Sequence, residues 1–82
     1  IDADFLARIK VEADNDEGLT AFVIAEISAM RLSFTQINGR INKDKQAEVE
    51  VRIKLNRRSD IDLLINRLKR DKHVIDVFRT FN

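Results

Sequence analysis

The chain has 82 residues, of which 44% are hydrophobic and 35% are charged, with 15 Lys and Arg against 14 Asp and Glu. This length suits one small domain, and the formal net charge of +1 excludes a strong overall field that would draw DNA or an anionic membrane to the whole molecule. Because cysteine is absent and histidine occurs once, disulfides, thiolate metal sites, cysteine nucleophiles and histidine-rich metal centres are excluded.

The first half of the chain predicts a strand, a helix and a second strand. Residues Phe5–Ala13 alternate between apolar and polar side chains, as in a strand with one wet face. The polar stretch Asp14–Gly18 breaks this pattern, and its residue types are typical of a turn and a helix cap. Apolar residues then recur at helical spacing over Leu19–Met30, and Arg31 ends the helix. Alternation returns, more weakly, over Phe34–Ile41.

The second half repeats this order. Asn42–Lys45 is a polar turn, and Ala47–Leu55 has the clearest alternation in the chain. Ser59 and Asp60 are predicted to cap a second helix with an apolar stripe, acids at its start and bases at its end. Val74–Phe81 is the last predicted strand. The chain therefore repeats a strand–helix–strand unit in pattern, although not in residue identity.

The element order β-α-β-β-α-β predicts an α+β fold: a ferredoxin-like sandwich of a four-stranded antiparallel sheet with both helices on one face. The helices cover the apolar face. The other face is expected to be polar, with side chains of both signs forming pairs across strands. Its predicted members are Arg8, Lys10, Glu12, Gln36, Asn38, Arg40, Glu48, Glu50, Arg52 and Lys54, and Phe78 is its one apolar side chain.

Several functions of this fold are excluded by the residues present. Single-strand RNA recognition needs exposed aromatic side chains on the central strands, and the third strand has none. Metal transfer needs cysteines in the first loop. No serine has a histidine or nucleophile-elbow glycines nearby, and His73 is placed to complement the end of the second helix rather than to act as a base. We therefore expect no catalytic site, no bound metal and no cofactor.

The loop before the first helix is the remaining candidate site. Free backbone N–H groups at a helix N-terminus bind carboxylates, and the side-chain amide of Asn15 can add a further contact. Gly18 lets a ligand approach the backbone without a Cβ in the way.

The chain resembles the ACT domain, a βαββαβ module that senses small molecules in enzymes of amino-acid and nucleotide metabolism. The resemblance rests on a strand followed by a turn, a glycine and a helix-opening leucine, here Val11–Leu19, and it extends over essentially all residues. Within that family it is similar to the C-terminal ACT domain of RelA/SpoT proteins, the bifunctional (p)ppGpp synthetase/hydrolases or GTP pyrophosphokinases. The residues that carry this likeness are Phe5–Ile9, Gly18–Thr20 and Val74–Arg79.

The resemblance implies where an effector binds. In ACT domains that bind amino acids, the ligand lies between two copies, and the matching positions here are the Asn15 side chain, the backbone of Glu17, Gly18 and Leu19, and Ser33. A third side-chain position of some members is Ala13 here. Asp16 and Glu17 replace the usual Arg and Pro, and the resulting acidic loop favours a zwitterionic effector over an anionic one.

The resemblance implies a regulatory domain, residues 1–82, that is itself no enzyme. It would form the C-terminal part of a cytoplasmic GTP pyrophosphokinase/(p)ppGpp hydrolase, sense an amino acid and form a homodimer through exposed sheet edges, plausibly the second strand. The alternatives are a module that docks on the ribosome, RNA or protein, and the effector domain of an amino-acid biosynthetic enzyme. No contact with DNA or membrane is expected. The candidate docking residues are Arg57, Arg58, Arg67 and Arg70.

Overall fold

The computed structural model of the chain describes residues 5–14 and 17–81. Six elements follow one another in the predicted order: β1 (Phe5–Ala13), α1 (Leu19–Ala29), β2 (Ser33–Ile41), β3 (Ala47–Leu55), α2 (Ser59–Lys69) and β4 (Val74–Thr80). The bounds of β1 and β3 agree with the alternating patterns, whereas β2 begins one residue before and β4 ends one residue before the predicted bounds. The strand–helix–strand repeat is therefore confirmed.

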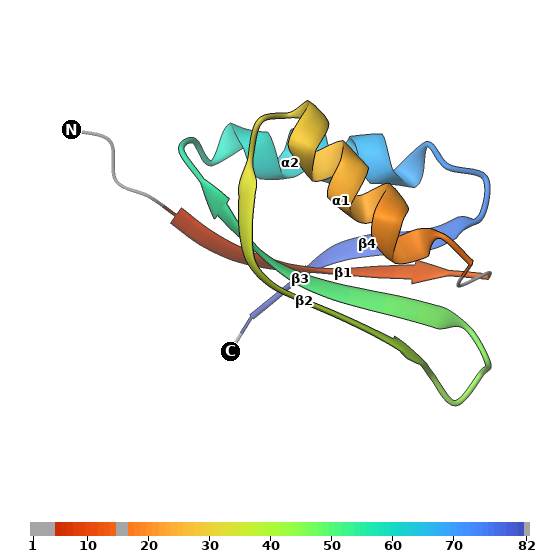
Figure 1. Ribbon diagram of the computed structural model, residues 1–82. Helices are drawn as coiled ribbons and strands as arrows, with labels where there is room; N and C mark the ends of the chain where they lie inside the picture. Colours follow the sequence, from red (N-terminus) through yellow and green to blue (C-terminus); the bar gives the residue numbers. More distant parts are fainter. Residues whose placement is uncertain (1–4, 15–16, 82) are drawn as a thin grey trace.

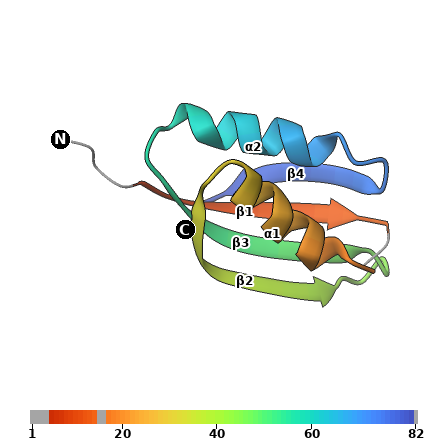
Figure 2. The ribbon, with the colours of Figure 1, turned by 45° about the horizontal axis from the view of Figure 1, so that its top comes forward.

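The strands form one antiparallel sheet in the order β2-β3-β1-β4, so β2 and β4 are its edges. Both helices lie on the same face of the sheet (Figure 1). Seen from above that face, α1 crosses the half that contains β3, and α2 runs along the half that ends in β4 (Figure 2). The predicted ferredoxin-like sandwich is confirmed, and β2 is left at the margin of the helix layer.

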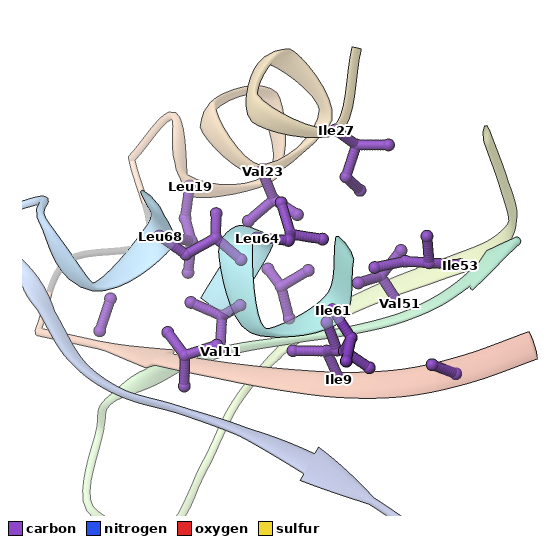
Figure 3. Close-up of a cluster of buried hydrophobic side chains, with 14 of the residues drawn as sticks. Ile9, Val11, Leu19, Val23, Ile27, Val51, Ile53, Ile61, Leu64 and Leu68 are labelled. Atoms are coloured by element: carbon purple, nitrogen blue, oxygen red, sulfur yellow. The ribbon is translucent and has the colours of Figure 1, made fainter. Parts of the chain in front are cut away.

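The core lies between the helices and the sheet. The apolar positions of β1 and β3 face Val23 and Ile27 of α1 and Leu64 and Leu68 of α2, all of which are almost fully buried (Figure 3). Each such side chain stabilises the fold by roughly 1.5–3 kcal/mol when it leaves water. β2 contributes little to this core, because every residue in it except Ile37 is exposed. Neither helix in the described residues is long and apolar enough to cross a membrane.

The helix starts differ from the sequence prediction. No described side chain caps either helix: Gly18 occupies the N-cap of α1 and Arg58 that of α2. Ser59 and Asp60 instead lie inside the first turn of α2, where Asp60 is buried and its carboxylate lies 3.9 Å from Arg57. The predicted charge asymmetry of α2 is confirmed, with acids in its first turn and bases in its last.

The uncovered face of the sheet is polar, as predicted. Residues that pair across strands lie on the same face, and the register places Lys10 opposite both Glu50 and Phe78. Phe78 therefore belongs to this face at the edge strand β4, where it is 36% exposed. The side chains of this face were predicted to be solvated, but Glu48 is buried, with only 7% of its surface exposed.

Candidate functional site

The candidate loop joins the end of β1 to the start of α1. Gly18 has φ of +74°, a left-handed conformation that a glycine adopts without cost, and a Cβ at this position would meet no atom within 4 Å. Its carbonyl accepts the first bond of the helix from the Phe22 N–H at 2.8 Å. No described side chain caps α1, and the first N–H groups of a helix have no partner within the helix itself.

A groove of about 460 Å³ lies directly beside this helix start. It lies between the N-terminus of α1 and the hairpin that joins the end of β2 to the start of β3. The lining residues are Leu19, Thr20, Gly39, Arg40, Ile41, Ala47, Glu48 and Val49. Its apolar side comes from Ile41 of the edge strand β2 and from Ala47 and Val49 of β3, and its polar side includes Thr20 at the helix start and Arg40. A groove of this volume is large enough for a small metabolite.

Gly39 determines how closely β2 approaches the helix. A Cβ placed on it would lie 3.3 Å from Thr20 Oγ1, which is tighter than ordinary van der Waals contact. Gly39, Arg40 and Ile41 were not among the site residues predicted from the sequence. The signal was present, because a glycine inside an alternating strand indicates a close approach by another group.

The sheet behind the groove is held by a network around Glu48 on the uncovered face. Arg40 Nε donates to Glu48 Oε1 at 2.9 Å, Asn42 Nδ2 donates to Glu48 Oε2 at 3.0 Å, and Lys10 Nζ lies 4.0 Å away. The hydrogen bonds from Asn42 and Arg40 hold the pKa of Glu48 below its usual value, against the effect of burial. Asn42 Oδ1 also accepts bonds from the N–H groups of Asp44 and Gln46. The hairpin end of the groove is therefore fixed.

The start of the loop between β1 and α1 is hydrogen-bonded to the turn before β4. The Asp14 N–H donates to the carbonyl of His73 at 3.0 Å, and His73 Nδ1 lies 3.2 Å from Asp14 Oδ1. His73 thus contacts the candidate loop rather than the end of α2, contrary to the sequence prediction. Its own N–H donates to Asp71 Oδ1 at 2.8 Å. These bonds anchor the first residue of the loop.

The structure places the predicted effector residues in two groups. Glu17, Gly18 and Leu19 lie together at the start of α1, and Asn15 lies outside the described residues. Ser33 begins β2 at its other end, six residues before Gly39, which corresponds to about 20 Å along a strand. One copy of the chain therefore does not bring Ser33 to the groove. Ala13 is fully buried and faces the core.

The predicted docking arginines are spread over both ends of α2. Arg67 Nε donates to Glu26 Oε1 at 2.9 Å, which joins the two helices. Arg58 lies over the ring of Phe5, with 5.3 Å from its Cζ to the ring centroid. These contacts and that of Arg57 with Asp60 are all intramolecular.

The described strands and helices define a ferredoxin-like domain with a groove beside the start of α1. The sequence matches the ACT domain family over residues 2–79, and the chain belongs to that family. ACT domains are regulatory and non-catalytic, so the chain is a regulatory domain. No curated protein matches this sequence.

Solved structures agree with this assignment. The chain is similar to the ACT domain from GTP pyrophosphokinase of Chlorobium tepidum. The match to its solution NMR structure has a TM-score of 0.79 and 24% identity, and it covers 96% of this chain and 89% of that one. The match to its crystal structure has a TM-score of 0.80 and 23% identity, and it covers 95% of this chain and 100% of that one. It is also similar to part of a homoserine dehydrogenase from Thiobacillus denitrificans, with a TM-score of 0.73 and 13% identity over 94% of this chain and 17% of that one. At these identities the likeness establishes the fold.

Proposed function

We propose that this ACT domain senses an amino acid in the groove beside α1 and regulates the catalytic domains of a stringent-response GTP pyrophosphokinase/(p)ppGpp hydrolase. The observation that carries the proposal is the groove beside the start of α1: Leu19 and Thr20 line it, and Gly18 directly before them has no Cβ that could obstruct a ligand. The N–H groups there suit the carboxylate of an amino acid. Ile41 and Val49, which line the groove, suit an apolar side chain of the amino acid.

A second copy of the chain completes the site. β2 is an edge strand whose outer side pairs with no described strand, and two such strands can pair in antiparallel fashion about a twofold axis. That pairing brings Ser33 of one copy alongside the Gly39 end of the other. Ser33 therefore reaches the groove only across the interface, as the family resemblance implies.

The surface next to β2 suits such an interface. α1 carries a single charged side chain, Glu26, which is engaged with α2. The exposed residues of α1 are small and uncharged, among them Ala21, Ala25 and Ser28. On β2 itself, Phe34 is 38% and Ile41 53% exposed. Small uncharged side chains on α1 and exposed apolar side chains on β2 are typical of contacts between protein chains.

The choice of parent enzyme rests on the Chlorobium tepidum domains, which this chain covers almost completely and with TM-scores near 0.8. The effector domain of an amino-acid biosynthetic enzyme is the second candidate, because the homoserine dehydrogenase contains the same fold. Docking on the ribosome, RNA or protein remains a further prediction. It has less structural support than sensing, because Arg57, Arg58 and Arg67 make intramolecular contacts.

A ¹⁵N NMR titration with each common amino acid tests the sensor. We expect saturable shifts of the Gly18, Leu19, Thr20 and Gly39 amides with one L-amino acid, and none with its D-enantiomer. Sedimentation should show a dimer under the same conditions. A monomer at high concentration would refute the shared site, and a dimer that responds to no amino acid would refute the sensing role.

A mixing experiment tests whether the site is composite. Thr20→Glu places a carboxylate in the first turn of α1, where it stabilises the helix but competes with the effector. Ser33→Ala removes the contact from the second copy, and Ser59→Ala serves as its control. Each defective variant alone should bind weakly, whereas an equal mixture should recover about one quarter of the wild-type sites, because half the dimers are mixed and one site in each is intact. No recovery on mixing would show that both residues serve the same copy.

A further inference from the structure

We propose that the side chain of Asp76 closes the β4 edge of the sheet to pairing with a strand of another copy of this chain. β2 and β4 are the two edges of the sheet, and an edge strand is a template on which a further strand can pair. Closing β4 limits strand pairing between copies to β2. The inference does not depend on effector binding, and it holds whether or not copies pair through β2.

The sequence of β4 makes this edge prone to pairing. Four of the five residues in Val74–Phe78 are β-branched or aromatic, and Asp76 is the only charged one. Apolar, strand-forming segments of this length pair between chains unless a charge interrupts them. The edge is also accessible, because Ile75 is 51% and Phe78 is 36% exposed. An unprotected β4 is therefore expected to associate.

The Asp76 carboxylate occupies a backbone donor in the middle of this strand. The Val77 N–H donates to Asp76 Oδ1 at 2.9 Å. The pairing of β4 with β1 continues in register from Asp76 to Thr80, so the carboxylate does not lie between these two strands. The N–H groups of an edge strand alternate between the neighbouring strand and the open side. The carboxylate therefore lies on the open side, where an incoming strand would have to displace a charged acceptor from the Val77 N–H.

A bulge beside Asp76 interrupts the edge further. The register with β1 shifts between Glu12 and Ala13, so that Ile75 is an extra residue in β4. Bulges break the regular row of donors and acceptors that another strand needs. Only Phe78–Thr80, the last three residues of the strand, lie beyond both the bulge and the covered N–H of Val77.

The stability of the sheet does not explain Asp76. Aspartate is unfavourable in strands, and Glu12 of β1 stands directly opposite Asp76 in the register. Like charges in directly opposed positions destabilise a sheet. A residue that breaks two local rules without stabilising the fold points to the control of association.

The β2 edge is regular over a longer stretch. β2 pairs with β3 in continuous register over Gln36–Ile41, and its register shift lies near its start, between Phe34 and Gln36. When β4 is closed, copies that pair through β2 form a closed dimer. Two open edges would instead allow the sheet to extend from copy to copy without end. Asp76 therefore keeps the assembly finite.

Sedimentation velocity of Asp76→Ala over a wide range of protein concentration tests the proposal. We expect the average mass to rise with concentration and to exceed that of the wild type by about twofold or more, because each opened edge adds a copy. Asp76→Asn keeps an oxygen that can accept the Val77 N–H, and it should associate less than Asp76→Ala. At low concentration Asp76→Ala should unfold at the same or a higher temperature than the wild type, since the repulsion from Glu12 is gone, which excludes unfolding as the cause of association.

Glu12→Ala is the matched control, because it removes one carboxylate from an inner strand and relieves the same repulsion. Its mass should equal that of the wild type. Adding Ile75→Lys to Asp76→Ala should restore the wild-type mass, because a lysine on an edge opposes pairing there. Ile41→Lys places the same charge on β2. Asp76→Ala should still raise the mass in that background, which separates this proposal from pairing through β2.

An Asp76→Ala protein with the mass of the wild type at every concentration would overturn the proposal. Equal association of Glu12→Ala would attribute the effect to net charge. Equal association of Asp76→Asn and Asp76→Ala would attribute it to the charge of Asp76 and not to its bond with Val77. Association that survives Ile75→Lys would place the contact outside β4. Each of these results contradicts the closure of the β4 edge by this bond.

Discussion

Gly39→Ala probes the distance between β2 and the start of α1, which sets the width of the effector groove. Alanine in a strand is ordinarily more stable than glycine by about 0.5–1 kcal/mol. Here the new methyl group would lie 3.3 Å from Thr20 Oγ1, while its next contacts, at 3.8 Å, are ordinary. Overpacking of this kind costs about 1–3 kcal/mol. We therefore expect a net destabilisation of about 1 kcal/mol.

The sign should reverse when Thr20 is shortened. In a Thr20→Ala background the close contact no longer exists, and Gly39→Ala should stabilise the domain by about 0.5–1 kcal/mol. Urea unfolding of the four proteins gives the coupling free energy, expected near about 1.5 kcal/mol. Gly18→Ala is the control: its cost arises from a positive φ and not from a neighbour, so it should be the same in both backgrounds.

Binding supplies a second readout for the same variants. The methyl group that Gly39→Ala adds narrows the groove, so the amino acid that shifts the Gly18 and Thr20 amides should bind more weakly to this variant, whereas Thr20→Ala keeps the groove open. If Gly39→Ala stabilises the domain equally in both backgrounds, a Cβ on Gly39 does not come within 3.3 Å of Thr20 Oγ1. The start of α1 and β2 are then further apart, and the groove between them is too wide for its role in sensing.

Three further results are expected from urea unfolding. Glu48→Gln should cost about 1.5–3 kcal/mol by weakening bonds to a charged acceptor. Asn42 and Arg40 lower the pKa of Glu48 in the folded state. The stabilisation by ionised Glu48 is therefore complete above pH 4.5, the ordinary pKa of this group, and is lost as the pH falls below that value. The difference in unfolding free energy between wild type and variant should shrink in acid and not in base. Leu64→Ala should cost about 2–5 kcal/mol, since that side chain is fully buried. Arg67→Gln should cost at most about 1 kcal/mol, with a loss that decreases in high salt, because the ion pair that joins the helices is partly exposed; a salt-independent loss would point to packing instead.

The fold could be predicted because each element carries its own periodic pattern. The alternation over Phe5–Ala13 and Ala47–Leu55 sets which face of each central strand is buried, and a shift of one residue would expose the whole apolar set. The helix starts could not be predicted in the same way. A serine or aspartate beside a helix caps it only if its φ and ψ lie outside the helical region, and Ser59 and Asp60 are already helical.

The groove was only half predictable, because it depends on contacts between distant parts of the chain. The loop at Gly18 has a local signature, whereas the approach of Gly39 to Thr20 joins residues 19 positions apart. Glu48 was expected to be solvated, since alternation places it on the wet face. It is buried because the side chains of Arg40 and Lys10 on both neighbouring strands converge on it. Alternation determines the face of a side chain but not how its neighbours cover it.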